Sequence, residues 1–389
     1  MSVGLKQIRS ASDAIRAAVD RTPLVWSRSL SLRAGVPVTL KLENLQRTGS
    51  FKVRGAYNRL SLLTPAERRR GVVTASAGNH AQGVALAAVA LGVSSTIVMP
   101  EGSSIAKQEA SRSYGASVVI SGKDLDAAMT RARRIERDEG RVFVHPFDDD
   151  AVIAGQGTVG VEILEERPDL ATIVVPVGGG GLAAGIGIAA KALNPKIQVV
   201  GVTASARPTL ADGIAVKGPS RRTRLLLERY VDRFVAVAEE EIAEAILLLM
   251  EHKRIIAEGA GAAALAALLT YGGKWGRRWR GPVCVVVSGG NIDVNLLDRI
   301  IERGLARSGR LLRLSVSLPD RPGALAGLSA AVGCLGANIL HIVHDRLARD
   351  LPITQSRVIL SLETRGVAHN EEIMADLRHR GYRLLPFNE

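Results

Sequence analysis

The stretch KLENLQRTGSFKVRGA, residues 41–56, places Lys52 directly after Phe51 and between two glycines, Gly49 and Gly55. A lysine amine that forms a Schiff base needs a defined setting and a lowered affinity for protons. The alternative interpretation of this segment is that Lys52 is a surface lysine in a basic loop. The motifs that follow along the chain decide between these two readings of Lys52.

A second glycine-rich segment lies downstream, after an apolar run at residues 172–177 that predicts a strand. Its four glycines are Gly178, Gly179, Gly180 and Gly181. Without Cβ atoms, a glycine turn at a helix start lets backbone N–H groups cradle a phosphate. A dinucleotide turn would need an acid at the end of the next strand, where Thr203 stands. Pyridoxal 5'-phosphate is the cofactor that requires both a reactive lysine and a phosphate turn.

Three further motifs follow in a fixed order. They are ASAGNHAQG at residues 75–83, GQGT at 155–158 and SGGN at 288–291. With the lysine segment and the glycine turn, they resemble the serine/threonine dehydratases, which are tryptophan-synthase-β-like (fold type II) pyridoxal phosphate enzymes. The resemblance covers roughly residues 20–300. Within this family, the chain resembles the threonine dehydratases, which are also called threonine ammonia-lyases.

The resemblance implies a role for each motif. Lys52 would carry the cofactor and later remove the α-proton of the substrate, while Phe51 would pack against the cofactor ring. The glycine turn and the following Leu182 would hold the phosphate, and Asn79 would contact the ring hydroxyl. Ser288 would face the pyridine nitrogen, where a neutral hydroxyl suits β-elimination better than transamination.

The loop before residue 81 is expected to bind the substrate carboxylate. Its residues are Ser76, Ala77, Gly78, Asn79 and His80. Helix N-capping by Ser76 or Asn79 is the alternative for this loop, and both interpretations can hold together. Serine racemases have a serine where Ala77 stands, which favours elimination over racemisation. They also use a glutamate where Thr203 stands for a divalent ion, so no metal site is predicted.

The resemblance implies β-elimination (dehydration and deamination) of L-threonine, and also of L-serine, to 2-oxobutanoate or pyruvate plus ammonia. An amino-acid racemase or a β-replacement enzyme of the same fold remains an alternative. A non-catalytic amino-acid sensor is a third, from a different class. The sequence leaves open the preference between threonine and serine, and whether the role is catabolic or lies in isoleucine biosynthesis.

Short apolar runs alternate with helical segments, which indicates an α/β fold with parallel sheets. We expect a two-lobed catalytic region over residues 1–310, with a smaller lobe at about 51–145. Strands are predicted at 71–75, 95–100, 117–120 and 141–144 within the smaller lobe. The cofactor would lie in the cleft between the lobes.

Residues 311–389 show the strand and helix order βαββαβ, which is ferredoxin-like. This segment resembles an ACT regulatory domain, a type that binds a small amino acid between copies. The residues expected to bind the effector are Asp320, Pro322, Gly323, Ala324 and Asn338. We expect isoleucine or valine as the effector and a homo-oligomer, either a dimer or a tetramer.

The composition excludes several classes of protein. The net charge is +13 and the pI about 10.2, but the basic residues are dispersed and only 3% of residues are aromatic, which argues against a nucleic-acid partner. Cys284 and Cys334 are the two cysteines, as expected in a reducing cytoplasm. No segment has the length and apolarity of a membrane span or the pattern of a signal peptide, so no membrane partner is predicted.

Overall fold

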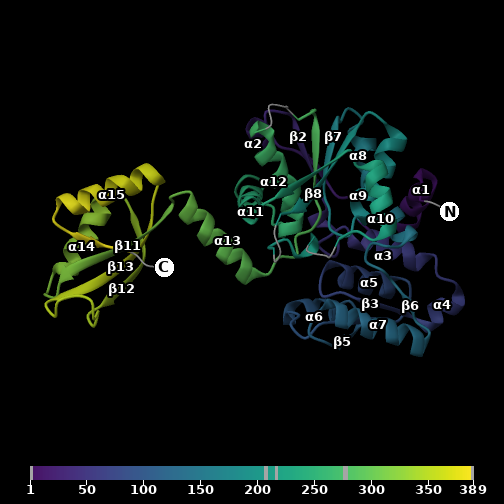
Figure 1. Cartoon of the computed structure of the whole chain (residues 1–389), viewed down its shortest axis with the longest axis horizontal. Coiled ribbons are helices and arrows are strands. Elements are labelled where there is room, and N and C mark those ends of the chain that lie inside the picture. Colours follow the sequence, from purple (N-terminus) through teal and green to yellow (C-terminus); the bar gives the residue numbers. More distant parts are fainter. Residues whose placement is uncertain (1–2, 206–208, 215–217, 275–278, 387–389) are drawn as a thin grey trace. The chain divides into compact units, whose positions relative to one another are not determined.

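The computed structural model describes residues 3–205, 209–214, 218–274 and 279–386. The chain divides into two compact units, Met1–Ile292 and Asp293–Glu389 (Figure 1). The first unit carries one parallel and one mainly parallel sheet, each covered by helices on both faces, and therefore has a mixed α/β fold.

The larger lobe of the first unit is built on a sheet with the order β1-β2-β10-β7-β8-β9. The bounds are β1 (Leu24–Trp26), β2 (Val38–Leu42), β7 (Thr172–Pro176), β8 (Gln198–Ala204), β9 (Arg233–Val237) and β10 (Val283–Val287). All neighbouring strands run parallel except β1, which pairs antiparallel with β2. Strand β10 reads VCVVV and is wholly buried, as expected for a strand covered on both faces. Its pairing with β2 brings together segments from near the two ends of the first unit.

Helices cover both faces of this sheet. The helical bounds are α1 (Leu5–Ile15), α2 (Arg28–Ala34), η1 (Glu43–Leu45), α8 (Asp150–Glu166), α9 (Gly181–Leu193), η2 (Asp212–Ile214), α10 (Arg221–Tyr230), α11 (Glu239–Lys253) and α12 (Gly259–Lys274). Helices α1, α8 and α9 share a core with β7 and β10. On the other face, α12 packs against the sheet and α11 packs against α12 (Figure 1). Helices α8 and α9 approach so closely that a Cβ at Gly185 would lie 2.5 Å from the Ile153 carbonyl oxygen.

The smaller lobe has a parallel sheet with the order β5-β4-β3-β6. Its elements are α3 (Lys52–Ser61), α4 (Pro65–Arg70), β3 (Val72–Ala75), α5 (Asn79–Ala90), β4 (Ser95–Met99), α6 (Ile105–Ser113), β5 (Ser117–Ile120), α7 (Leu125–Glu139) and β6 (Val142–Phe143). The four predicted strands are present, with each bound shifted by at most one residue. Helix α5 packs on one face of the sheet and α7 on the other. Helix α3 lies between α5 of this lobe and α8 of the larger one, which places Lys52 at the junction of the lobes.

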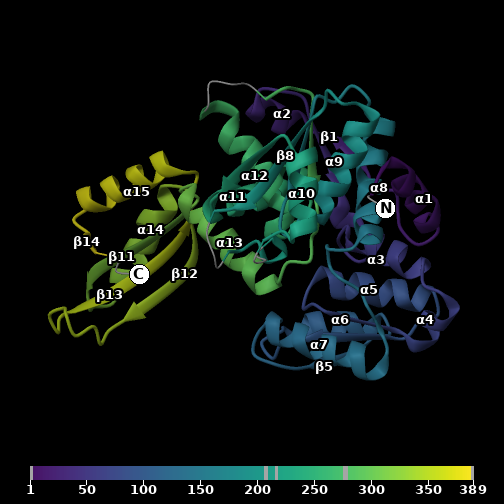
Figure 2. The ribbon, with the colours of Figure 1, turned by 45° about the vertical axis from the view of Figure 1, so that its right-hand side comes forward.

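The second unit contains the predicted βαββαβ order. Its elements are α13 (Val294–Arg307), β11 (Leu311–Pro319), α14 (Ala324–Cys334), β12 (Asn338–Asp345), β13 (Gln355–Glu363), α15 (Val367–His379) and β14 (Arg383–Leu385). The sheet is antiparallel with the order β12-β13-β11-β14, and α14 and α15 pack on one face of it (Figure 2). Helix α13, which precedes residue 311, is grouped with this unit.

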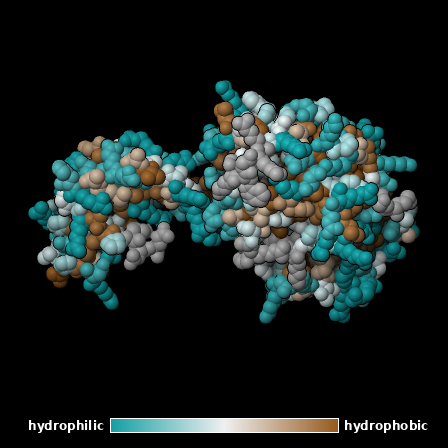
Figure 3. Space-filling model, turned by 45° about the horizontal axis from the view of Figure 1, so that its top comes forward, coloured by the Kyte–Doolittle hydropathy of each residue, from teal (hydrophilic) through white to brown (hydrophobic). Residues whose placement is uncertain are grey.

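The surface and the cysteines have ordinary properties. Hydrophilic side chains are spread over the face seen in Figure 3, with apolar residues in smaller areas between them. Cys284 is buried in β10, and its burial raises the pKa of the thiol to about 12, whereas Cys334 is exposed. Among the residues that the structure describes, no helix is both long and apolar enough to cross a bilayer.

Candidate functional site

Lys52 is the first residue of α3, and its amine is desolvated. The Nζ atom donates a hydrogen bond to the Pro146 carbonyl at 3.0 Å and lies 5.2 Å from the centre of the Phe51 ring. Burial lowers the pKa of Lys52 to about 8, although the negative charge of Glu258 opposes this effect. A substantial fraction of the amine is therefore neutral near physiological pH and can act as a nucleophile.

The turn that carries Pro146 is fixed by His145. The Nδ1 atom of His145 accepts hydrogen bonds from the backbone N–H groups of Phe147 at 3.2 Å and Asp148 at 2.8 Å. Burial lowers the pKa of His145 to about 4, so the imidazole stays neutral and keeps a lone pair for these donors. The Pro146 carbonyl is thereby held towards Lys52.

Two motifs that are far apart in the sequence meet beside Lys52. The backbone N–H of Phe51 donates to the carbonyl of Ser288 at 3.2 Å, and that of Gly290 donates to Gly49 at 2.9 Å. Ser288 directly follows β10 and is buried. The lysine segment and the Ser-Gly-Gly-Asn motif thus form one wall of the site.

Asn79 belongs to a chain of polar side chains on this wall. Its Nδ2 donates to the Glu258 carboxylate at 2.7 Å, and its Oδ1 accepts from Asn291 Nδ2 at 2.7 Å. Asn291 also donates to the Thr48 carbonyl at 2.8 Å. Sequence reasoning assigned no role to Glu258 or Asn291. Asn291 lies within a motif that it singled out, and Glu258 is an isolated acid just before the small-residue helix α12.

The loop before α5 leaves the start of that helix without a side-chain cap. The N-cap is Gly78, which has no side chain that could accept a hydrogen bond from the first turn. Ser76 Oγ instead accepts from the N–H of Gly78 at 3.2 Å, within the loop. The alternative that Ser76 or Asn79 caps the helix is therefore wrong. The N–H groups of Asn79 and His80, at the helix start just after Ala77, can donate to an anion such as a carboxylate.

His80 contributes less to this loop than expected. Its side chain is buried, and its Nε2 lies 3.1 Å from the Val144 carbonyl, to which it donates. Burial lowers the pKa of His80 to about 3, so the ring is neutral and its Nδ1 has no proton to donate. Only the backbone N–H of His80 is left to face a carboxylate.

The glycine turn opens α9, also without a side-chain cap. Gly180 is the N-cap and has a φ of 90°, a backbone conformation that other residues rarely adopt. A Cβ at Gly179 would overlap the Phe147 ring, and one at Gly178 would lie 2.9 Å from Ile214 Cα. Phe147 follows Pro146, so this turn is linked to the Lys52 contact through two consecutive residues. Gly181 and Leu182 supply free N–H groups at the helix start.

On another side of α3 lies a cluster of buried charges, the Arg54 cluster, formed by Arg54, Glu43, Glu162 and Lys41. Arg54 is fully buried and forms two hydrogen bonds of 2.8 Å with Glu43. It also donates to Glu162 at 2.6 Å, and Lys41 donates to the same carboxylate group at 2.6 Å. Burial alone would lower the pKa of Arg54, but the two carboxylates raise it above its usual range. The cluster ties α3 to η1, β2 and α8.

In the second unit, the predicted effector residues fall into two separate places. Asp320 is bound by Arg346 at 2.8 Å, and Gly323 caps α14 with a φ of 84° beside Pro322 and Ala324. Asn338 donates to Glu363 at 3.2 Å and lies level with the first residue of β11, whereas Asp320 follows its last residue. Within one copy, the two groups therefore lie at opposite ends of the sheet.

A family model for pyridoxal-phosphate-dependent enzymes matches residues 15–289. The chain belongs to this family. It is 48% identical to an L-threonine ammonia-lyase of Thermotoga maritima, over 98% of both chains. It is 46% identical to an L-threonine ammonia-lyase of Geobacter sulfurreducens, over 96% of this chain and 97% of the relative. Both similarities therefore include the second unit.

Solved structures match more than three quarters of the chain. The processed form of threonine deaminase isoform 2 from Solanum lycopersicum has a TM-score of 0.72 and 35% identity, covering 78% of this chain and 90% of that one. A maize serine racemase also has a TM-score of 0.72, with 31% identity over 79% of this chain and 99% of that one. The fold is that of the fold-type-II pyridoxal phosphate enzymes.

The residues of this family member fit pyridoxal 5'-phosphate. The lowered pKa of the Lys52 amine suits a bond to the cofactor carbonyl, and the uncapped start of α9 suits its phosphate. The buried Ser50 Oγ, two residues before Lys52, makes no hydrogen bond among the described residues. In the same ranges, no three His, Cys, Asp or Glu side chains gather as a metal site would require.

Proposed function

We propose that this chain is a threonine ammonia-lyase that converts L-threonine, and also L-serine, to 2-oxobutanoate or pyruvate plus ammonia. The observation that carries the proposal is the desolvated amine of Lys52, at the junction where the uncapped starts of α5 and α9 also open. A carboxylate and a phosphate can be held there beside one reactive amine. The similarity to two L-threonine ammonia-lyases over nearly the whole chain supports threonine as the substrate.

Each part of the site has its own task in this proposal. Bound pyridoxal phosphate supplies an electron sink for the bonds at the substrate's α-carbon. The start of α9 holds the phosphate, and the start of α5 holds the substrate carboxylate. Lys52 Nζ takes the α-proton, for which a pKa of about 8 is well matched. The hydroxyl of Ser288 is neutral, so it does not add a negative charge beside the ring.

Racemisation and sensing are the competing functions. A racemase needs a second proton donor on the opposite face of the α-carbon, and Ala77 has no proton to give. A non-catalytic sensor would have no need for a lysine with a lowered pKa.

Product analysis tests the proposal. Purified protein loaded with pyridoxal phosphate is incubated with L-threonine, L-serine and a panel of other L-amino acids. Keto acids and ammonia are quantified, and D-amino acids are sought by chiral chromatography. We expect keto acid from threonine and serine in equal amount to ammonia. Formation of D-serine without keto acid would instead identify a racemase, and no product from any amino acid would favour a sensor.

For the tail, we propose an ACT-like regulatory domain over residues 311–389 that binds isoleucine or valine between copies of a homo-oligomer. The βαββαβ order and the positive φ angles of Gly323 and Gly336 support it. Because Asp320 and Asn338 lie at opposite ends of one sheet, a complete site needs two copies. Calorimetry on an isolated fragment 293–389 should detect isoleucine or valine, and Asn338→Ala should weaken that binding. No heat with any amino acid would reject the regulatory assignment.

A further inference from the structure

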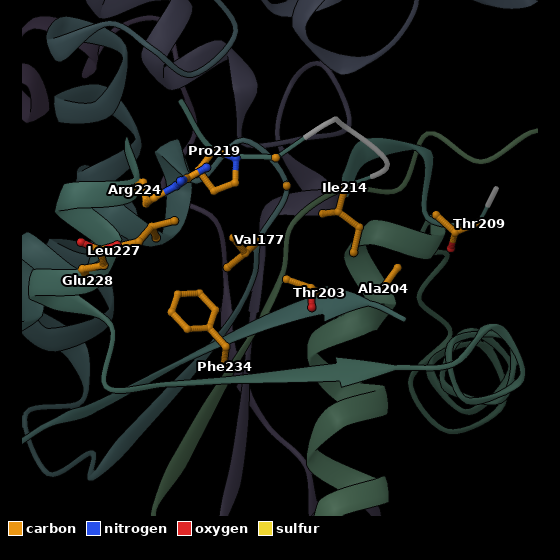
Figure 4. Close-up of a pocket in the computed structure, with 12 residues that line it drawn as sticks. Val177, Thr203, Ala204, Thr209, Ile214, Pro219, Arg224, Leu227, Glu228 and Phe234 are labelled. Atoms are coloured by element: carbon orange, nitrogen blue, oxygen red, sulfur yellow. The ribbon is translucent and has the colours of Figure 1, made fainter. Parts of the chain in front are cut away.

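A cavity of about 320 Å³ lies behind the glycine turn, at the carboxyl ends of β7 and β8 (Figure 4). Its walls include apolar side chains from separate elements, among them Val177, Ile214, Leu227 and Phe234. Ligand pockets in proteins are about 300–1,000 Å³, so the volume suits a small molecule. The cavity is therefore large enough to bind a metabolite.

Lys52 and its partner Pro146 are not among the residues that line the cavity. Of the turn residues, Gly178 lines the cavity, and a Cβ there would approach Ile214. The next residue, Gly179, faces the Phe147 ring, on the side where Pro146 contacts Lys52. Neighbouring residues of the glycine turn thus face different surroundings: Gly178 faces the wall of the cavity, and Gly179 faces the Phe147 ring.

Two opposite charges line the cavity from α10. Arg224 and Glu228 are one helical turn apart and are exposed. Within the described ranges, neither side chain forms a hydrogen bond or an ion pair. On the same helix, Arg222 pairs with Asp148 at 3.5 Å and Asp150 at 3.3 Å. Arg224 and Glu228 are therefore available to a ligand that carries both charges.

We propose that this cavity binds a free α-amino acid with an apolar side chain. The guanidinium of Arg224 can hold the carboxylate through two parallel hydrogen bonds, and Glu228 can hold the ammonium group. The apolar side chain would pack against Phe234, Leu227 and Val177. A dicarboxylate or a phosphate would place negative charge beside Glu228, and an uncharged hydrocarbon would leave both charges unused.

Binding in the cavity is coupled to the cofactor turn through Gly178. This residue forms part of the cavity wall and also begins the turn, so a ligand that contacts the wall also contacts the turn. The amino acid would therefore change the affinity for pyridoxal phosphate, and the cofactor would change the affinity for the amino acid by the same factor.

Calorimetry with full-length, cofactor-loaded protein tests the proposal. L-Leucine is the probe, and leucinamide and N-acetyl-leucine each lack one of its charges. We expect leucine to bind and each analogue to bind about tenfold more weakly or worse. The variants Arg224→Gln and Glu228→Gln should weaken leucine binding by a similar factor, and Ala204→Trp should block it by filling the cavity.

The matched control is Arg221→Gln, which removes an exposed arginine of α10 that does not line the cavity. It should bind leucine like the wild type, and all variants should keep the wild-type melting temperature. Equal leucine affinity in the wild type, Arg224→Gln and Glu228→Gln would overturn the proposal, because the amino acid would then bind elsewhere. Absence of leucine binding to the wild type would overturn it too. Leucine can also bind at the proposed substrate site beside Lys52, so the effect of Arg224→Gln and Glu228→Gln, and not binding alone, assigns the heat to the cavity.

Discussion

Arg54 and Lys52 lie on α3 with one residue between them, and burial acts on the charged ends of both, yet their surroundings shift their pKa values in opposite directions. Arg54 is met by two carboxylates, Glu43 and Glu162, at hydrogen-bond distance. Lys52 donates to a neutral carbonyl, and Glu258 offsets only part of the desolvation. Arg54 therefore stays charged, whereas the protonation equilibrium of Lys52 is shifted towards the neutral amine. Burial alone does not make a reactive amine: the number of carboxylates in direct contact decides the outcome.

Of the variants that distinguish the surroundings of Lys52 from the Arg54 cluster, Lys52→Ala is expected to have the largest effect, a loss of turnover. Turnover of L-threonine should fall by about 10⁴-fold or more, because no other amine can take its place. The fold should persist, since the variant leaves no carboxylate of the Arg54 cluster unpaired. Ammonia release and the melting temperature of the apoprotein check these two expectations, with Lys6→Ala, at an exposed position, as the control. Undiminished turnover would remove Lys52 from the mechanism.

Replacement of Arg54 by Met should have the reverse pattern, with the main loss in stability. Glu43 is fully buried, and Glu162 is nearly so. Without the guanidinium they would be buried charges with too little compensation, which costs about 3–5 kcal/mol. Denaturant unfolding of the apoprotein measures this loss. The double variant Arg54→Met/Glu43→Gln should recover part of it, and a double variant as unstable as the sum of the single ones would contradict the pairing.

The sequence predicted one side of this comparison and not the other. Lys52 stands in a local motif, and the glycine turn follows a strand and opens a helix. Both could therefore be predicted from residues that are adjacent in the sequence. The pairing of Arg54 with Glu162 joins α3 to α8, more than a hundred residues away. Glu258 approaches Lys52 only because β10 and β2 meet in one sheet. Contacts of this kind depend on the packing of whole elements and leave no local pattern.

The dependence on packing also explains why the predicted alternative of a helix cap at Ser76 or Asn79 was wrong. It explains too why the role predicted for Gly179 was incomplete. Ser76 is a residue type that often caps helices, but its hydroxyl is engaged within the loop. The glycine at position 179 was expected to leave room for a phosphate. In the structure it also leaves room for the Phe147 ring, which comes from the segment before α8. A residue's type indicates what it can do, and the packing decides which of these possibilities is realised.

Gly179→Ala tests whether the turn near Lys52 is set by the Phe147 ring. A Cβ at this position would overlap the ring, and such overpacking costs about 1–3 kcal/mol. We expect a roughly tenfold weaker affinity for pyridoxal phosphate, measured by titration of the apoprotein. Gly78→Ala is the matched control in the other loop, because a Cβ there would meet nothing within 4 Å. An unchanged cofactor affinity in Gly179→Ala would show that the ring can move aside at no cost.

The smallest effect concerns Glu258, the carboxylate that partly compensates Lys52. Its negative charge raises the pKa of Lys52 against the larger effect of burial, so Glu258→Gln should lower that pKa further below about 8. A change of roughly one pH unit or less is expected for a charge of this kind. The neutral side chain keeps an oxygen that can accept from Asn79, so the polar chain on this wall is preserved.

The pKa of Lys52 can be measured in the apoprotein by competitive acetylation and mass spectrometry across a pH series, with Lys6 as the internal reference. The direction is fixed by linkage. The pKa of the folded form, about 8, lies below the usual 10.5, so the unfolded chain binds more protons between these values. The unfavourable contribution of Lys52 to folding is complete below pH 8 and fades as the pH rises towards 10.5. In Glu258→Gln, the pH range over which this unfavourable contribution fades should begin at a lower pH. A midpoint of acetylation that stays the same or moves upward would show that Glu258 does not raise the pKa of Lys52, and that the two carboxylates beside Arg54 alone distinguish the two residues.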